Sequence, residues 1–195
     1  MGTKNRSAYS RLVLATAVAV FCMMPHVSFA GDNPIAVTAQ GTAAPENTFS
    51  ASAGDPSFVS IAGGGYDVLH NYTAGEFRAE YRDSTELFFL KPFFGLLGTT
   101  DGAFYGYGGL RADLYFGSRF VLMPNAAVGY YDNGSGKNLG SHVEFRTGAE
   151  FAYRFDDRSR LGLSFNHISN AGIGKTNPGE EEVGLVFSLP ITLLK

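Results

Sequence analysis

The sequence predicts an all-β protein, a transmembrane antiparallel β-barrel of about eight strands. Apolar and polar residues alternate along several segments, as they do in strands whose two faces meet different surroundings. The longest segments are long enough for the ~9–11 residues with which a tilted strand crosses a bilayer. The N-terminal stretch also has the features of an export signal, which favours a location in the outer membrane of a Gram-negative cell.

Residues 1–30 are predicted to be a signal peptide. Three basic residues precede an uncharged, mostly apolar stretch over residues 12–24, and small residues lead to a cleavage site after Ala30. Cys22 would suit a lipoprotein, but Phe21 occupies the position where a small residue is needed. We therefore expect cleavage by the ordinary signal-peptide route.

The net charge of the exported part is mildly negative. The chain has 15 Lys+Arg and 18 Asp+Glu, and three of the basic but none of the acidic residues lie in residues 1–30. The exported part thus has 12 basic and 18 acidic residues, a net charge of −6. This charge and the lack of a basic stretch argue against nucleic acid as a partner. The only cysteine leaves with the signal, and the sequence suggests neither a cofactor nor a metal site.

Residues 31–56 are rich in Ala, Thr, Ser and Pro without a sustained period, and we expect a flexible lead-in there. Residues 57–195 are expected to form the barrel as one domain. No second apolar run approaches the ~18 residues of a membrane helix. Composition alone leaves a secreted soluble β-sandwich open as the alternative.

The clearest alternation runs through residues 143–155. One face is apolar except for Thr147, and the opposite face carries opposite charges such as Glu144 and Arg146. Residues 76–82 repeat the pattern over a shorter length. Apolar side chains are expected to face lipid, and the charged ones to form a structural ion-pair network that fills the interior.

Eight segments are predicted as strands: 57–67, 75–83, 86–97, 103–117, 119–131, 142–155, 159–170 and 181–194. An even number of strands brings both ends of the barrel chain to one side. In this class that side is the periplasm, and the longer loops lie outside. The connection between the last two strands would then emerge at the outer surface.

Three residues suited to nucleophilic catalysis fall on the lipid-facing side of the last two strands. His167 and Ser169 continue the outward alternation of one strand, and Glu181 continues that of the next. Polar groups on a lipid face are costly unless they partner one another, which favours a functional site. The alternative is that they are interfacial residues beside lipid headgroups. A one-residue slip of register would also present Glu180 or Glu182 in place of Glu181.

Other polar residues and prolines receive structural interpretations. His70 and His142 are predicted to be solvated residues at strand ends or in loops. Pro92 and Pro124 lie within predicted strands and are expected to mark bulges or local breaks.

The stretch 165–182 resembles the lipid A 3-O-deacylase family (the PagL type) of outer-membrane acyl hydrolases. The motifs that carry the resemblance are His167-x-Ser169-Asn170-Ala171-Gly172 and Asn177-x-Gly179-x-Glu181. The resemblance implies an eight-stranded barrel whose site faces the outer leaflet and removes the ester-linked acyl chain at position 3 of lipid A. It further implies that Ser169 is the nucleophile, His167 the general base and Glu181 its orienting carboxylate.

The family's oxyanion contacts would fall on Asn170 and Gly172, through their backbone N–H groups. Two other functions stay open at this stage. One is a non-enzymatic structural or adhesive barrel, and the other is a different lipid-modifying enzyme such as a phospholipase or an acyltransferase. The sequence also leaves open the acyl-chain preference and whether the barrel is a monomer or a homodimer.

Overall fold

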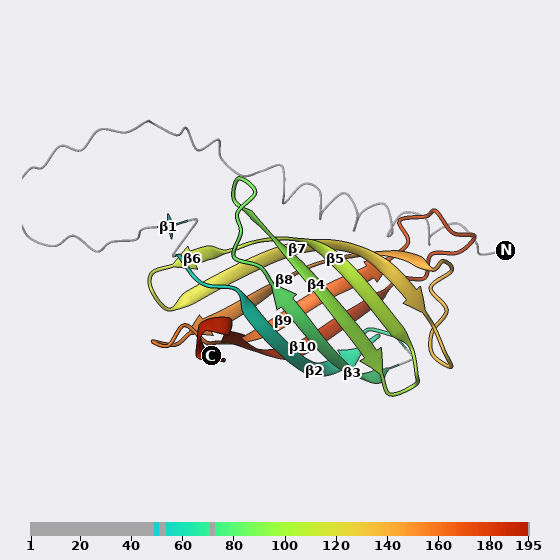
Figure 1. The fold of residues 1–195 in the computed structure, drawn as a ribbon. Helices are drawn as coiled ribbons and strands as arrows, with labels where there is room; N and C mark the ends of the chain where they lie inside the picture. Colours follow the sequence, from blue (N-terminus) through green and yellow to red (C-terminus); the bar gives the residue numbers. More distant parts are fainter. Residues whose placement is uncertain (1–48, 51–53, 71–72, 195) are drawn as a thin grey trace, which may run out of the picture. The chain divides into compact units, whose positions relative to one another are not determined.

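The computed structural model describes residues 49–50, 54–70 and 73–194 (Figure 1). The predicted signal peptide (1–30) and most of the predicted lead-in (31–56) lie outside the described residues. The long strands are β2 (Phe58–Tyr66), β3 (Ala74–Arg82), β4 (Leu90–Thr99), β5 (Phe104–Ala112), β7 (Phe120–Asp132), β8 (Val143–Arg154), β9 (Arg160–Ser169) and β10 (Glu180–Pro190). Two short strands, β1 (Phe49–Ser50) and β6 (Leu114–Phe116), pair with each other.

The strands form one closed antiparallel sheet. The pairing runs β7-β5-β4-β3-β2-β10-β9-β8, and β8 pairs back onto β7. The first and last long strands, β2 and β10, are therefore neighbours, with Val183 opposite Gly65. The prediction of an eight-stranded antiparallel barrel is confirmed by these eight long strands. Within the described residues, no helix is long and apolar enough to cross a membrane.

Most strand limits lie within two residues of those predicted, but two differ by four residues. β4 begins at Leu90 instead of residue 86. The backbone N–H of each of Leu87 and Leu90 donates to the carbonyl oxygen of the other, which closes a tight turn in which Phe88 has a φ of 66°. The last strand ends at Pro190, and Ile191–Leu193 then forms a 3₁₀ turn. In both places apolar residues continue past the strand, so hydrophobicity alone does not reveal where the pairing stops.

The two prolines behave differently. β4 continues through Pro92, which pairs with Leu110 in regular register, so the predicted break is absent there. Pro124 lies within the unbroken strand β7, but the predicted strand 103–117 beside it is divided into β5 and β6. Because proline has no N–H to donate, the interruption lies where one bond of the ladder is missing.

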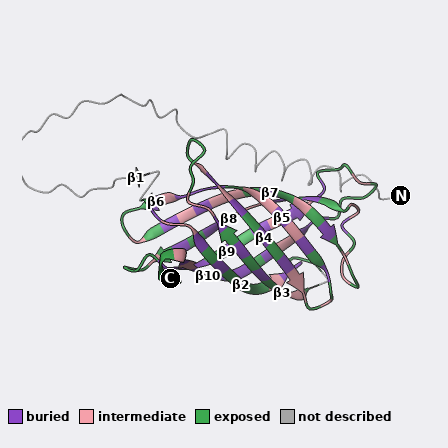
Figure 2. Ribbon diagram, viewed as in Figure 1, coloured by how far each residue is buried: buried purple, intermediate pink, exposed green. Residues whose placement is uncertain are grey.

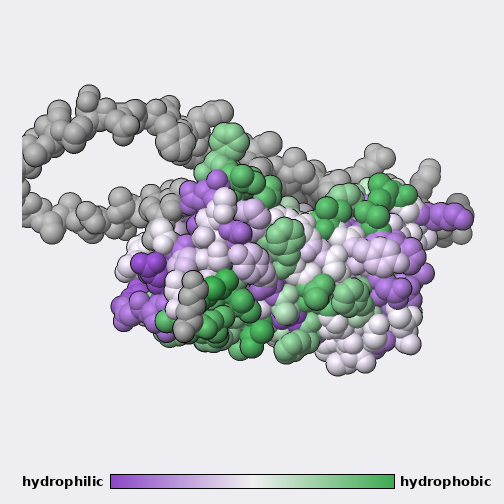
Figure 3. Space-filling model, viewed as in Figure 1, coloured by the Kyte–Doolittle hydropathy of each residue, from purple (hydrophilic) through white to green (hydrophobic). Residues whose placement is uncertain are grey.

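Burial alternates along the strands, as Figure 2 shows. Outward residues are mostly apolar, and hydrophilic ones gather toward the two ends in Figure 3. Buried charged residues line the interior: Glu76, Arg78, Glu80, Arg82, Lys91, Arg111, Asp113, Glu144, Arg146, Glu150, Arg160, Glu180 and Glu182. An interior cavity lined by several of them measures only about 10 Å³, space for about one water molecule. The interior is thus packed.

Ion pairs hold this interior together. Arg78 lies 3.0 Å from Glu76 and 3.1 Å from Glu182, and Arg146 lies 2.8 Å from Glu182. Arg82 bridges two strands by bonding Glu80 on its own strand and a carboxylate of β8. The expectation of a structural ion-pair network is confirmed.

We call the end of the barrel with connections 67–73, 100–103, 133–142 and 170–179 the distal end, and the other the proximal end. β2 begins and β10 ends at the proximal end. Asp55, within the predicted lead-in, is buried there and bonds Arg154 and Arg160 of the barrel. Burial raises the pKa of Asp55, but the bonds from the two guanidinium groups outweigh it and hold that pKa at about 2.

Candidate active site

The three candidate side chains lie on the outer surface of β9 and β10. Leu161, Leu163 and Phe165 are exposed on β9, and His167 and Ser169 follow at alternate positions, partly exposed. On β10 the side chain of Glu181 is 16% exposed, whereas Glu180 and Glu182 are buried inside the barrel. The register therefore presents Glu181 outward.

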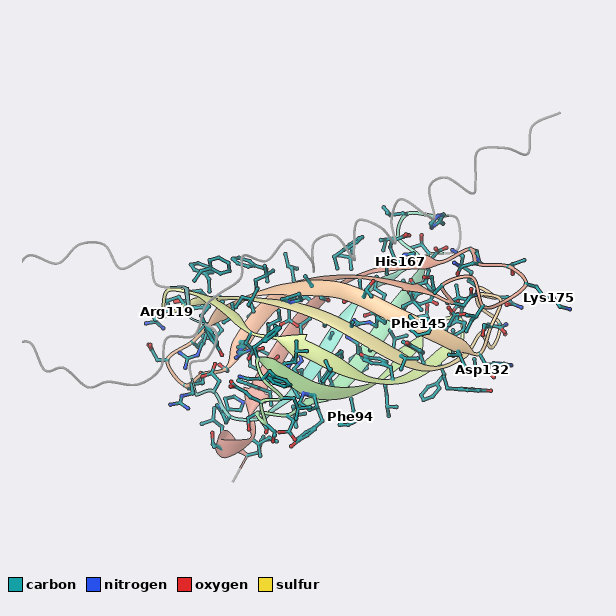
Figure 4. All side chains as sticks on the ribbon, turned by 90° about the horizontal axis from the view of Figure 1, so that it is seen from above. Phe94, Arg119, Asp132, Phe145, His167 and Lys175 are labelled. Atoms are coloured by element: carbon teal, nitrogen blue, oxygen red, sulfur yellow. The ribbon has the colours of Figure 1, made fainter. Side chains whose placement is uncertain are left out.

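His167 and Glu181 are directly opposite each other in the β9–β10 ladder. The Nδ1 atom of His167 lies 3.2 Å from the Oε1 atom of Glu181. A carboxylate at this distance requires a proton on Nδ1, which leaves the lone pair of the neutral ring on Nε2. His167 is thus arranged as a base with its reactive nitrogen away from Glu181. Figure 4 shows His167 toward the end that carries Asp132 and Lys175.

Gly179 makes room for the imidazole. It has a φ of +64°, and a Cβ built on it would lie 2.8 Å from Cε1 and 3.3 Å from Nε2 of His167. Because Glu180 pairs with Ile168, the ladder extended by one step brings Gly179 opposite Ser169. The Cε1–Nε2 edge of His167 therefore points toward the distal end, where Ser169 is the next outward residue of β9. Among the described residues, no side chain forms a hydrogen bond with the Ser169 hydroxyl.

The connection after Ser169 is held by hydrogen bonds within itself and to the connection 133–142. Asn170 is buried, and its side-chain amide donates to the carbonyls of Leu139 and Thr176, each at 2.8 Å. Its backbone N–H donates to Oδ1 of Asn177 at 3.0 Å, and the N–H of Gly172 donates to Oδ1 of Asn170 at 2.9 Å. Both N–H groups expected to face an oxyanion therefore have acceptors within the connection.

Ala171 lies between these two residues in a left-handed conformation, with a φ of 52°. Its backbone N–H has no acceptor among the described residues. It is the free donor two residues after Ser169. Ala171 was not predicted as a site residue, because the identity of a residue does not reveal whether its backbone N–H is hydrogen-bonded in a loop.

A further group of polar residues adjoins Glu181 from the connection between β2 and β3. His70 Nδ1 lies 3.2 Å from Glu181 Oε2 and 3.0 Å from Asp67 Oδ1. The ammonium of Lys137 lies 2.6 Å from the same Asp67 oxygen. His70 is half-exposed, as a loop residue should be, but it is not merely solvated. In a closed barrel the first and last strands are neighbours. The order of the strands could therefore have predicted that His70, after the first strand, lies near Glu181 on the last.

His142, the other histidine predicted to be solvated, has a local role. Its Nδ1 lies 2.9 Å from the carbonyl oxygen of Tyr131, and its ring stacks on Tyr130 at 5.1 Å between centroids. It belongs to the distal end but is not among the residues that contact Glu181. His142 therefore offers a matched control for His70.

The closed barrel, its apolar exterior and its ion-paired interior define a small membrane β-barrel of the outer-membrane class. The sequence model of the family described as Lipid A 3-O-deacylase (PagL) matches residues 62–190. The chain belongs to this family, which confirms the resemblance noted in the sequence.

Among solved structures, the chain is similar to one described as the crystal structure of the outer membrane enzyme PagL. The TM-score is 0.55 at 18% sequence identity, and the match covers 68% of this chain and 99% of that one. At this identity the likeness shows the fold. No curated protein sequence matches the chain.

Proposed function

We propose that this protein is an esterase that removes the acyl chain ester-linked at position 3 of lipid A. Ser169 is the nucleophile, His167 the general base and Glu181 the carboxylate that orients the imidazole. The observation that carries the proposal is the 3.2 Å contact between His167 and Glu181 on the outer surface, on the side where Ser169 lies. Family membership supplies the substrate class.

The surroundings of Ser169 suit an ester that stays in a membrane. Phe145 on β8 is directly opposite Ser169 and is exposed, and Phe165 is exposed two positions before His167. An acyl chain lying against these rings would enter the apolar layer, and its ester would lie at the polar end of the strand. A lipid that leaves the bilayer only at great cost can reach a nucleophile displayed in this way. We accordingly propose that the distal end faces the outer leaflet.

The reaction follows from the positions of the groups. His167 Nε2 takes the hydroxyl proton of Ser169 as Oγ attacks the ester carbonyl, and the imidazolium is stabilised by Glu181. The tetrahedral intermediate collapses, the bond to the lipid A oxygen breaks, and His167 returns the proton to that leaving oxygen. Water then hydrolyses the acyl-enzyme by the same proton route, which releases a fatty acid and regenerates Ser169.

The oxyanion of the intermediate needs backbone donors near Ser169. We propose that the N–H of Ala171, which has no acceptor among the described residues, is the first of them. Asn170 and Gly172 remain the donors that the family resemblance implies. They would serve once their N–H groups exchange their acceptors within the connection for the substrate.

The test is mass spectrometry of lipid A from cells that express the full chain. Wild type should remove one 3-hydroxyacyl unit and release it as a free fatty acid. Ser169→Ala should leave lipid A intact, and Ser135→Ala, which changes an exposed distal serine, should behave as wild type. Unchanged lipid A with a folded wild-type barrel would refute the proposal. Lysophospholipid instead of a lipid A product would indicate a phospholipase.

A further inference from the structure

Glu181 is held between two histidines from different parts of the barrel. One carboxylate oxygen, Oε1, lies 3.2 Å from His167 Nδ1. The other oxygen, Oε2, lies 3.2 Å from Nδ1 of His70 in the connection 67–73. The proposed mechanism uses only the first contact, so the second has no role assigned.

The backbone fixes this connection onto β10 and so fixes the position of His70. The N–H of Val68 donates to the carbonyl oxygen of Glu181 at 3.2 Å, just beyond the last pair of the β2–β10 ladder, Tyr66 and Glu182. The N–H of Asp67 donates to Oε2 of Glu180 at 3.2 Å, from inside the barrel wall. The N–H of His70 then closes a turn onto the carbonyl of Asp67. The approach of His70 to Glu181 is thus built into the strand pairing.

The side chain of Asp67 orients the His70 ring. It is buried, lies 3.0 Å from His70 Nδ1 and is itself paired with Lys137. Nδ1 of His70 therefore faces two carboxylates at once. A nitrogen lone pair in that position would be repelled by both, so Nδ1 carries a proton, which bonds Asp67. The same N–H lies beside Oε2 of Glu181, a buried oxygen with no hydrogen-bond partner among the described residues.

We propose that His70 is a positioning residue for the esterase site. The proton on its Nδ1, which lies 3.2 Å from Oε2 of Glu181, attracts that oxygen, limits rotation of the carboxylate and keeps Oε1 directed at His167. The inference rests on the proposed function and extends it. A carboxylate held at one oxygen samples several orientations, and a base that is poorly oriented lowers the rate of the chemical step more than substrate binding.

The alternative is that these groups form a binding site for a divalent cation. Asp67, His70 and Glu181 each offer one ligand atom, and these atoms lie within 4.8 Å of one another. However, the ammonium of Lys137 already lies 2.6 Å from an oxygen of Asp67. A positive charge is therefore already supplied by the chain, which favours the positioning role over a metal.

The test measures kcat and KM of the purified full chain on lipid A in detergent micelles. His70→Ala should lower kcat about tenfold with little change in KM. His70→Asn, whose side-chain N–H can replace Nδ1–H, should restore most of kcat, and His142→Ala should match wild type. Each variant is first shown to fold by the electrophoretic shift between heated and unheated barrel.

Three results would overturn the inference. The first is a kcat for His70→Ala within twofold of wild type, and the second is a loss that His70→Asn does not relieve. The third is a fall of wild-type activity to the His70→Ala level on adding a chelator, which would indicate a metal site. A wild type that releases no fatty acid at all would instead refute the proposed esterase itself.

Discussion

Glu181 and Glu182 are adjacent in the sequence but lie on opposite sides of the barrel wall. Glu182 is fully buried, and its Oε2 accepts bonds from Arg78 and Arg146. Glu181 faces outward, and its ion-pair partners among the described residues are the imidazoles of His167 and His70. Arginine stays protonated, so an Arg–Glu contact supports the fold, whereas histidine exchanges a proton near neutral pH. The partner, more than the carboxylate itself, therefore distinguishes Glu181, proposed to serve catalysis, from Glu182, which supports the fold.

Replacing each of the two glutamates separately by alanine tests this comparison, and the largest effects are expected here. Glu181→Ala should reduce activity per folded molecule about 10³–10⁴-fold, because the imidazolium loses its stabilising carboxylate. Its unfolding free energy should change little. Deacylation assays and urea unfolding in detergent would measure the two quantities.

Glu182→Ala should do the opposite. It leaves two buried guanidinium groups short of an acceptor, which should cost about 3 kcal/mol of unfolding free energy. The folded fraction should keep its activity. Full activity in Glu181→Ala combined with a loss in Glu180→Ala or Glu182→Ala would show that the register assigned to β10 is incorrect.

Two glycines, one beside the His167 ring and one remote from it, provide the test with the next largest expected effect. Gly179→Ala places a Cβ against the His167 ring, and a displacement of about 1 Å there should lower activity on the order of 10²-fold. Gly117→Ala is the matched control, because its φ is also +64° but nothing lies within 4 Å of the added Cβ. Both should lose about 1 kcal/mol to backbone strain. Equal activity in the two variants would mean that Gly179 serves the turn alone.

The proximal cluster around Asp55 should make stability depend on pH. Its pKa is lowered from 3.8 to about 2, so the carboxylate stabilises the fold fully above pH 4 and this contribution is lost as pH falls toward 2. The contribution is about 2 kcal/mol. Asp55→Asn should lower stability by this amount at pH 7 and should flatten the curve between pH 4 and 2. Unfolding midpoints across that range would show whether the slope persists in the variant.

The smallest effect is expected at an ion pair that water surrounds. Arg119 and Asp156 lie 2.6 Å apart at the proximal end, but their side chains are 41% and 89% exposed. Arg119→Ala should leave the unfolding midpoint unchanged, since exposed pairs are screened and flexible. A shift as large as that of Asp55→Asn would contradict the distinction between buried and exposed pairs.

Much of the fold could be predicted, because alternation with period 2 is enforced by the bilayer on one side of every strand. The strand limits were less predictable where apolar residues lie beyond the paired segment, as they do before β4 and after Pro190. The outward placement of His167, Ser169 and Glu181 follows from the same alternation. Their chemical roles remain predictions that the proposed variants test.

The sequence by itself determined the class of barrel, the order of its strands and the candidate residues on their outer faces, because these depend on local periodicity and motif spacing. Only the tertiary structure decided which groups meet across the closure between β2 and β10. It brought His70 and Asp67 to Glu181. It also showed that the backbone N–H groups of Asn170 and Gly172 bond within their own connection, while that of Ala171 has no acceptor in the part of the chain that the structure describes. Such contacts join residues distant along the chain, and their geometry is set by register and loop hydrogen bonds that periodicity does not contain.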